Sequence, residues 1–523
     1  MCVHLFSLRQ LLFIVALNFL FNAQIEAAAQ AAESCKLTIQ LIESDTEQSV
    51  AGLVRVTDLT TEKHIVLKEL IKRELNWFAM PADSTIHVPR GRIRIEAMHG
   101  IETELKSTEI DLTGKTAAEV KIKLNRFIRT SKLGLRTGNT HVHLMKLTHA
   151  EAIRYLQIVP AADDVDLIFL SHLRRIPDER HYISNGIVEN SLAGGELARL
   201  SQGRVLYRPG QEHRNNFGRG GEGYGHVMFL DIVKLIRPVS IGPGIMREGT
   251  DGIPIQRGIR EAKSDGATVV WCHNTFGLED LPNWMAGTLD AQNIFDGGTH
   301  GSYEDTYYRY LNIGLKVPFS TGTDWFIYDF SRVYVPLEGK LTSNAWLKQL
   351  AAGRTFITNG PVLQLKAGGH QVGDIIRLEK PADVTIQGSA MGRANFKAIE
   401  LIHNGKVVKT WPVTLNGGHY KVEMEKMLTL NSPGWIALRI PLDAGTNEFG
   451  KRLYAHTSPI YFELDGARIF VRETAETMVA EMQESMNIIR EKAVFAVDSE
   501  REAVLNVHRE GIAILRKRLS EIE

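Results

Sequence analysis

The sequence has little cysteine, no excess charge of either sign and, after its first residues, no long hydrophobic run. Three of the 523 residues are Cys, and the wide separation of Cys35 and Cys272 does not indicate a disulfide framework. Lys plus Arg and Asp plus Glu number 61 each, so the net charge is zero and there is no electrostatic footprint for nucleic acid or an anionic membrane. The hydrophobic content of 44% is ordinary for a globular protein and excludes collagen, a disordered chain and a multi-span membrane protein.

Residues 1–31 are typical of a secretory signal peptide. Arg9 precedes an apolar run at 11–21, which is short for a bilayer span because about 20 apolar residues are needed. Small residues with Ala-x-Ala patterns follow at 27–31. We therefore expect a cleaved signal and a secreted or periplasmic protein that keeps no membrane segment. An uncleaved N-terminal anchor is the alternative.

Periodicity divides the rest of the chain into four segments. Residues 35–126 and 362–466 carry short period-two apolar runs broken by turn signals, which predict two β-sandwiches, the first similar to transthyretin-like or Ig-like modules. In residues 127–361, buried-looking strands alternate with helical stretches, which favours an α/β layer or barrel. Residues 467–523 have a helical period and predict a helical tail. That tail either docks on the body as a hairpin or pairs with a second copy, so a homo-oligomer stays open.

Histidine is concentrated in the barrel segment. Nine of the 18 histidines lie between His141 and His300, so chemistry is to be sought there. The strongest local signal is the His-x-His pair at His141 and His143. Residues at i and i+2 of a strand point to the same side, so at a strand end both imidazoles can meet one metal ion.

Further apolar runs in the same segment end in side chains that can bind metals. They lead to His172, Glu212, His273 and Asp324. In a closed α/β barrel the C-terminal strand ends surround one mouth, so these residues would converge there. His226 begins a strand instead of ending one, and fits such a ring less well. Imidazoles with carboxylates suit zinc, and also manganese or iron.

This set of residues resembles the polymerase-and-histidinol-phosphatase (PHP) superfamily of metal-dependent hydrolases. Within it, the pattern is most similar to the branch that contains the carbaryl hydrolase. The resemblance covers about residues 127–361, of which 353–361 is similar to the segment that closes the domain in that branch, and residues 404–406, 435–439 and 456–461 extend it into the following sandwich. It implies an α/β fold with a distorted (β/α)7 PHP-type barrel and one to three divalent metals. The two sandwiches would flank this barrel and the helical tail would close it.

The resemblance also assigns a site, residue by residue. The implied metal ligands are His141, His143, His172, Glu212, His226, His273 and Asp324. Asp324 or His172 could instead act as general base. Ser171 stands where the family usually has Asp, and Phe326 stands where its last His is expected. These departures count against a three-metal site and leave one or two ions, with zinc expected first and manganese or iron as alternatives.

The sequence therefore predicts a secreted metal-dependent hydrolase with a small-molecule substrate. A metal-activated water would attack an ester, carbamate, amide or phosphoester bond. The alternative from another class is a secreted binding protein on an impaired barrel, suggested by Ser171 and Phe326. No Gly-x-Ser-x-Gly is present, which argues against a serine hydrolase. His213 and Arg214 directly follow Glu212, and either line the pocket or are structural.

Overall fold

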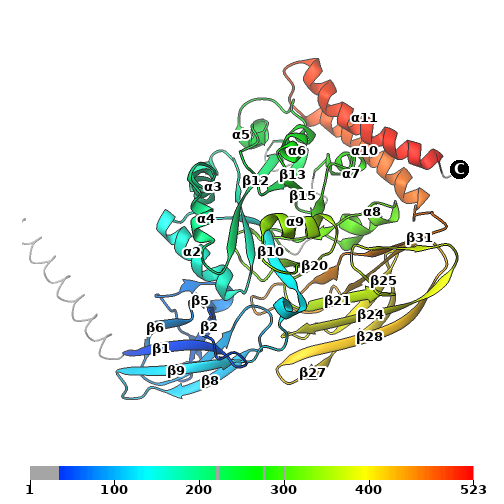
Figure 1. Cartoon of the computed structure of the whole chain (residues 1–523). Coiled ribbons are helices and arrows are strands. Elements are labelled where there is room, and N and C mark those ends of the chain that lie inside the picture. Colours follow the sequence, from blue (N-terminus) through cyan, green and yellow to red (C-terminus); the bar gives the residue numbers. More distant parts are fainter. Residues whose placement is uncertain (1–33, 219–222, 275–276, 299–300, 522–523) are drawn as a thin grey trace, which may run out of the picture. The chain divides into compact units, whose positions relative to one another are not determined.

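The computed structural model describes residues 34–218, 223–274, 277–298 and 301–521 (Figure 1). The predicted signal peptide at 1–31 lies outside these residues. The chain divides into two compact units, Met1–Met98 with Leu105–Leu124 and His99–Glu104 with Asn125–Glu523. Strands dominate the first unit, whereas the second combines strands with many helices, so the protein is mixed α/β.

The first unit consists of two β-sheets with a common core. One sheet has the order β6 (Asp83–Pro89), β1 (Ser34–Glu43), β9 (Ala117–Leu124). The other has the order β4 (Ile71–Lys72), β5 (Phe78–Met80), β2 (Gly52–Asp58), β7 (Arg92–Met98), β8 (Lys106–Asp111), with β3 (Lys63–His64) paired to β2. Alternate residues of β1, among them Leu37 and Ile39, are buried and join Val54 and Ile95 of the second sheet in one hydrophobic cluster. The period-two pattern therefore gives each sheet one apolar face, and the two faces pack together.

The second unit is built on a sheet that curls into a half barrel. Its strands are β10 (Leu135–His143), β11 (Leu167–His172), β12 (Leu206–Asn215), β13 (Gly225–Leu230), β14 (Ser240–Ile241), β15 (Thr268–Trp271), β16 (Ala291–Asn293), β17 (Phe319–Ser320), β18 (Asp324–Trp325), β19 (Arg332–Pro336) and β20 (Phe356–Thr358). Hydrogen bonds connect them in the order β18, β10, β11, β12, β13, β15, β16 and β17. All six residues of β11 are buried, as expected for a strand that is covered on both faces.

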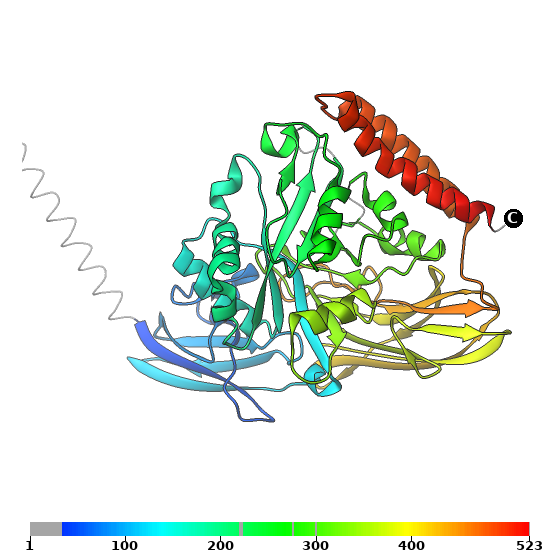
Figure 2. The same cartoon turned by 45° about the horizontal axis from the view of Figure 1, so that its top comes forward.

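Helices flank the curled sheet (Figures 1 and 2). They are α2 (His149–Ala162), α3 (Ile183–Gly194), α4 (Glu196–Leu200), α5 (Pro243–Met246), α6 (Ile255–Ser264), α7 (Asp280–Met285), α8 (Arg309–Asn312) and α9 (Ser343–Ala351), with single turns at Thr130–Leu133, Asp178–His181 and Glu304–Tyr308. Thr148 and Glu151 form a capping box that starts α2. In α6, Ile255, Ile259 and Ala262 are buried at helical spacing, so this helix turns one apolar stripe to the core.

The direction of β13 is the feature that matters most for the site. β13 runs antiparallel to both neighbours, β12 and β15, whereas β10, β11 and β12 are parallel. The β-hairpin between β12 and β13 therefore places the first residues of β13 beside the last residues of β12. A barrel of parallel strands alone would have put the two ends on opposite sides.

The half-barrel sheet continues into the C-terminal strands through the pairing of β20 with β30. The continuing strands are β23 (Ile375–Leu378), β25 (Ala398–His403), β26 (Lys406–Pro412), β29 (Gly434–Arg439), β30 (Ala455–Thr457) and β31 (Ile460–Leu464). A separate five-stranded sheet has the order β22 (His370–Gln371), β21 (Val362–Ala367), β24 (Ala382–Gly392), β28 (His419–Leu430), β27 (Thr414–Asn416). Contacts make all these strands part of the same unit as the half barrel.

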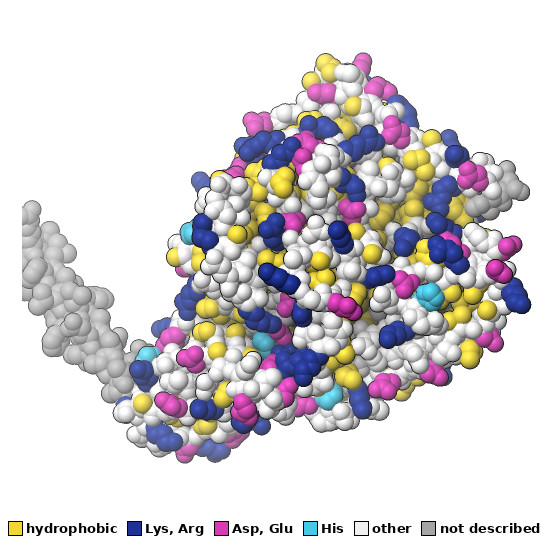
Figure 3. Space-filling model, in the orientation of Figure 1, with side chains coloured by type: hydrophobic (Ala, Val, Ile, Leu, Met, Phe, Trp, Pro, Cys, Tyr) yellow, Lys and Arg dark blue, Asp and Glu magenta, His cyan; other side chains and the backbone are white. Residues whose placement is uncertain are grey.

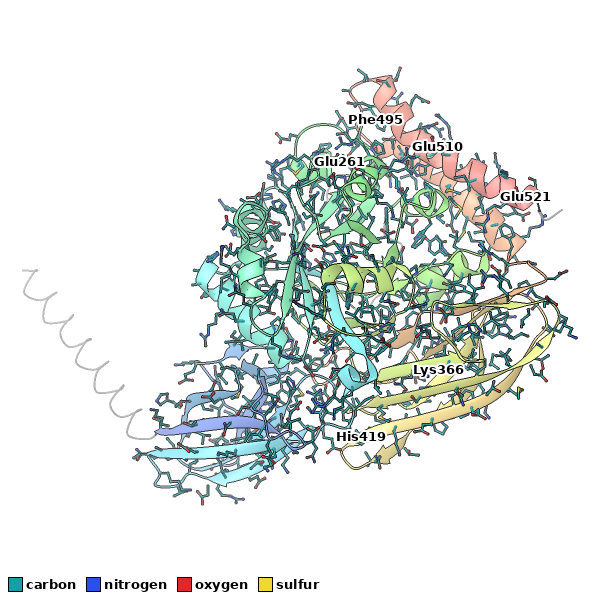
Figure 4. The ribbon with its side chains drawn as sticks, viewed as in Figure 1. Glu261, Lys366, His419, Phe495, Glu510 and Glu521 are labelled. Atoms are coloured by element: carbon teal, nitrogen blue, oxygen red, sulfur yellow. The ribbon has the colours of Figure 1, made fainter. Side chains whose placement is uncertain are left out.

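Two helices, α10 (Arg472–Lys492) and α11 (Asp498–Ser520), lie side by side near the C-terminal end (Figures 1 and 2). Figure 4 labels Phe495 in their connection and Glu510 on α11. The buried side chains of α10 are the six that the helical period places on one face, and several join the core of the half barrel: Ala475, Met478, Val479, Met482, Met486 and Ile489. Within the described ranges, no helix is long and apolar enough to cross a membrane. The face in Figure 3 intersperses Lys and Arg with Asp and Glu, in keeping with the balanced charge.

Candidate metal centre

Two imidazoles from β10 meet at the end of the half-barrel strands. His141 and His143 are fully buried, and their Nε2 atoms lie 3.1 Å apart. The other ring nitrogen of each histidine, Nδ1, is hydrogen-bonded on the far side of the ring. His141 Nδ1 lies 2.9 Å from Asp296 Oδ2, and His143 Nδ1 lies 2.9 Å from the Ser171 carbonyl oxygen. When each Nδ1–H donates to its oxygen, both Nε2 lone pairs face the same small volume.

Two carboxylates complete this group. Glu212 Oε2 lies 3.0 Å from His143 Nε2 and 3.7 Å from His141 Nε2. Asp324 Oδ1 lies 3.3 Å from His141 Nε2 and 3.7 Å from His143 Nε2, and it is buried with no hydrogen-bond donor among the described residues. The four ligand atoms all lie within 4.8 Å of one another. Metal bonds of about 2.0–2.1 Å in a tetrahedral zinc site place ligand atoms about 3.3 Å apart, so donor types and spacing fit a divalent ion.

A second group shares Glu212. Its other oxygen, Oε1, lies 3.0 Å from His226 Nδ1 and 3.7 Å from His273 Nε2. The rings of His226 and His273 meet edge to face at 5.1 Å. A carboxylate with one oxygen in each of two donor groups can serve two ions, so the residues present supply ligands for one ion or for an adjacent pair.

The electrostatics of the cluster favour a cation. Burial lowers the pKa of His141, but Asp324, Asp296 and Glu212 raise it to about 9. Burial likewise opposes a charge on His273, yet Asp296, Glu212 and Asp324 hold its pKa well above the usual value. Both rings are therefore protonated, because the surrounding carboxylates stabilise their positive charge. A divalent ion could replace that charge.

The carboxylates of Glu212 and Asp296 stay ionised despite their burial. Burial raises the pKa of Glu212, but Arg214 and the neighbouring imidazoles bring it well below its usual range. Asp296 is held low in the same way, because His273 and His141 outweigh the effect of burial on its pKa. Burial and Arg214 lower the pKa of His226 to about 3, so that ring is neutral and keeps a lone pair for a metal.

The backbone explains how residues so distant in sequence converge. Asp324 on β18 pairs with Val142, between the two histidines of β10, and Arg214 on β12 pairs with His226 on β13. His273 and Asp324 have positive φ values of 54° and 61°, which is sparsely populated for residues other than glycine and often marks functional sites.

Gly322 allows the strand-end loop to approach β10 closely. A Cβ atom at this position would lie 2.6 Å from the Cβ of His141 and 2.7 Å from its backbone nitrogen. Such distances are far below van der Waals contact, so only glycine brings Asp324, two residues later, to its place beside His141.

Of the residues expected at the site, His172 stands apart. Its Nε2 pairs with Glu189 Oε1 of α3 at 3.1 Å, and it belongs to none of the ligand groups among the described residues. On β11 it pairs with Gln211, one residue before Glu212, so alternation turns it to the other face of the sheet. Burial lowers its pKa, against the opposing effect of Glu189.

The two departures from the family pattern have different surroundings. Ser171 pairs with Gly210, two residues before Glu212, so it belongs to the face of the ligands and supports His143 through its carbonyl. The ring of Phe326 packs edge to face on Tyr155 of α2 at 5.7 Å.

The sequence reasoning missed Asp296, which lies beneath both His141 and His273. It follows the short strand β16, after Ile294 and Phe295, and is fully buried. The same signal, an apolar run ending in a carboxylate, was present here, but the polar residues of β16 interrupt the run. His213, in contrast, faces away from the cluster, with Nδ1 on the Val239 carbonyl at 3.0 Å.

No protein-family model and no curated protein matches this sequence. Among solved structures, the crystal structure of an engineered protein matches with 14% identity, over 60% of this chain and 71% of that chain, at a TM-score of 0.15. A likeness at this level carries no argument about fold or function. The conclusions about this protein therefore come from its own structure, which is a mixed α/β fold with a buried cluster of histidines and carboxylates that could hold a metal ion.

Proposed function

We propose that this protein is an exported metal-dependent hydrolase of the PHP type, similar to the carbaryl hydrolase branch, with a distorted (β/α)7 barrel. The single observation that carries the proposal is the convergence of His141, His143, Glu212 and Asp324 within 4.8 Å, with both histidines anchored through Nδ1. A small-molecule ester, carbamate, amide or phosphoester is the proposed substrate. Zinc suits this donor set best, with one or two ions per chain.

Each residue has a distinct part in this proposal. His141, His143, Glu212 Oε2 and Asp324 would hold one ion, and Glu212 Oε1, His226 and His273 a second. A divalent ion there would lower the pKa of a bound water to about 7 and stabilise charge on the substrate oxygen. Asp296 and the Ser171 carbonyl keep the two Nε2 atoms turned inward.

Asp324 would hold the ion through Oδ1, the oxygen near both histidines, and its other oxygen, Oδ2, would be left to transfer protons. Its side chain is 8% exposed and lies within the cluster, whereas His172 is engaged by Glu189. The carboxylate can accept a proton from water on the substrate side and release it to the leaving group.

A second candidate, a binding protein with a structural metal, is favoured by the depth of the cluster. His141, His143 and Glu212 are at most 1% exposed, which restricts the approach of a substrate. Closed, fully buried sites are typical of structural metals, whereas catalytic sites keep an open position.

Elemental analysis and a hydrolysis screen test both candidates. The purified protein is analysed for zinc, manganese and iron, and then assayed on aryl esters, aryl carbamates and phosphoesters before and after dialysis against a chelator. We expect at least one ion per chain and hydrolysis that chelation abolishes and zinc restores. A folded, metal-free protein without activity on zinc addition would contradict the proposal, and tightly bound metal without hydrolysis would support the binding protein.

A further inference from the structure

Arg214 is a buried cation beside the ligand cluster that metal binding does not explain fully. It lies two residues after Glu212 on β12, and therefore on the same face, directly opposite His226 of β13. The residue is 6% exposed. Its Nη1 donates to Glu212 Oε2 at 3.3 Å, but its Nε is buried without a hydrogen-bond partner in the described part of the chain.

A buried N–H donor without an acceptor lowers the stability of the folded state, because it has lost its hydrogen bonds to water. A bound ligand that accepts a hydrogen bond from Nε would remove this penalty. Neutralising Glu212 accounts for Nη1 alone, and a lysine could do the same. Nε belongs to the planar fork with which arginine binds both oxygens of a carboxylate or phosphate. Two parallel charge-assisted hydrogen bonds of this kind give both affinity and orientation.

We propose that Arg214 binds an oxyanion group of the substrate, so that the substrate is an anionic compound with a carboxylate or a phosphate next to the bond that is hydrolysed. This inference rests on the proposed function, because it places the anion beside the ligands of the proposed metal. It assigns Arg214 a role in substrate binding, in addition to its contact with Glu212.

Equilibrium binding tests the inference without catalysis. Zinc-loaded wild type, Arg214→Gln and Arg214→Lys are titrated calorimetrically with benzoate and, separately, with inorganic phosphate, and the metal content of each is measured. We expect Arg214→Gln to weaken anion binding at least about tenfold, as loss of a charged hydrogen bond would. Arg214→Lys keeps the charge but lacks the fork, so its affinity should fall between the other two. Arg208→Gln is the matched control, because Arg208 lies on the same strand but pairs with Asp231 away from the cluster.

Matched substrates then test whether Arg214 acts on the anionic group of the substrate or on the rest of the molecule. We compare 2-acetoxybenzoate, whose carboxylate lies next to the acetyl ester bond, with its neutral methyl ester. Arg214→Gln should raise KM for 2-acetoxybenzoate and leave KM for the neutral ester unchanged.

The outcomes distinguish this inference from the proposed function. Equal losses on charged and neutral esters, unchanged anion binding, or loss of metal in both Arg214 variants would overturn it and leave Arg214 as a support for Glu212. If the wild type itself binds no metal, it is the proposed function that fails.

Discussion

The carboxylate of Asp296 accepts a hydrogen bond from Nδ1 of His141, with Oδ2 and Nδ1 2.9 Å apart. This contact orients the ring of His141 and directs its Nε2 towards His143. Carboxylates behind metal-binding histidines typically change metal affinity by about 10–100-fold when removed.

We therefore predict that Asp296→Asn weakens zinc binding by about 10–100-fold, although no ligand is lost. Competition with a chromophoric chelator measures the affinity. The control is Asp443→Asn, which removes an exposed carboxylate paired with Lys397. An Asp296→Asn variant with wild-type zinc affinity would show that the contact does not support the ligand.

The second prediction compares two histidines of adjacent strands. His143→Asn should lose bound metal, because His143 Nε2 faces His141 and Glu212. His172→Asn should retain it, because His172 is directed to Glu189. Metal content after gel filtration decides the matter, and equal loss in both variants would make His172 a ligand after all.

Gly322 allows a third prediction. Gly322→Ala places a methyl group against the backbone and Cβ of His141, and overpacking of this kind destabilises by about 1–3 kcal/mol. We expect a lower Tm and weaker zinc binding, since Asp324 is displaced with the loop. Gly186→Ala in α3 is the control, because a Cβ there meets nothing within 4 Å. Unchanged Tm and zinc affinity for Gly322→Ala would contradict the close approach.

His508 of α11 predicts a dependence of stability on pH. It is fully buried, with Nε2 2.9 Å from the Leu278 carbonyl. Burial lowers its pKa from 6.5 to about 4, against the carbonyls of Leu278 and Val504. The folded state therefore resists protonation that the unfolded chain accepts. This contribution to stability is complete above pH 6.5 and is lost as the pH falls towards 4.

A depression of this size corresponds to about 3 kcal/mol at most. We expect His508→Gln to lose less stability than the wild type between pH 7.5 and 4.5, since glutamine does not titrate. Thermal unfolding across this range measures the two slopes. If the stability of the two proteins changes equally with pH, the pKa of His508 is the same in the folded and the unfolded state, which would contradict the prediction.

The sequence revealed the site better than it revealed the strand directions. His141 and His143 could be paired from spacing alone, because alternation along a strand is local. His226 began a strand and looked misplaced, and only the antiparallel run of β13, which is decided by long-range pairing, brings it to Arg214. The strand end at His172 was recognised, but its register with Gln211, which turns the ring away, is equally non-local.

The ladder between β20 and β30 joins Phe356, Ile357 and Thr358 to Thr457, His456 and Ala455. Through it the half barrel and the C-terminal strands share one hydrogen-bonded sheet, although a boundary near residue 361 was expected. A fragment that stops there would present β20 as a bare edge to other molecules, and such edges promote aggregation. For expression work, the shortest sensible piece of this unit therefore extends past Leu464, the last residue of β31.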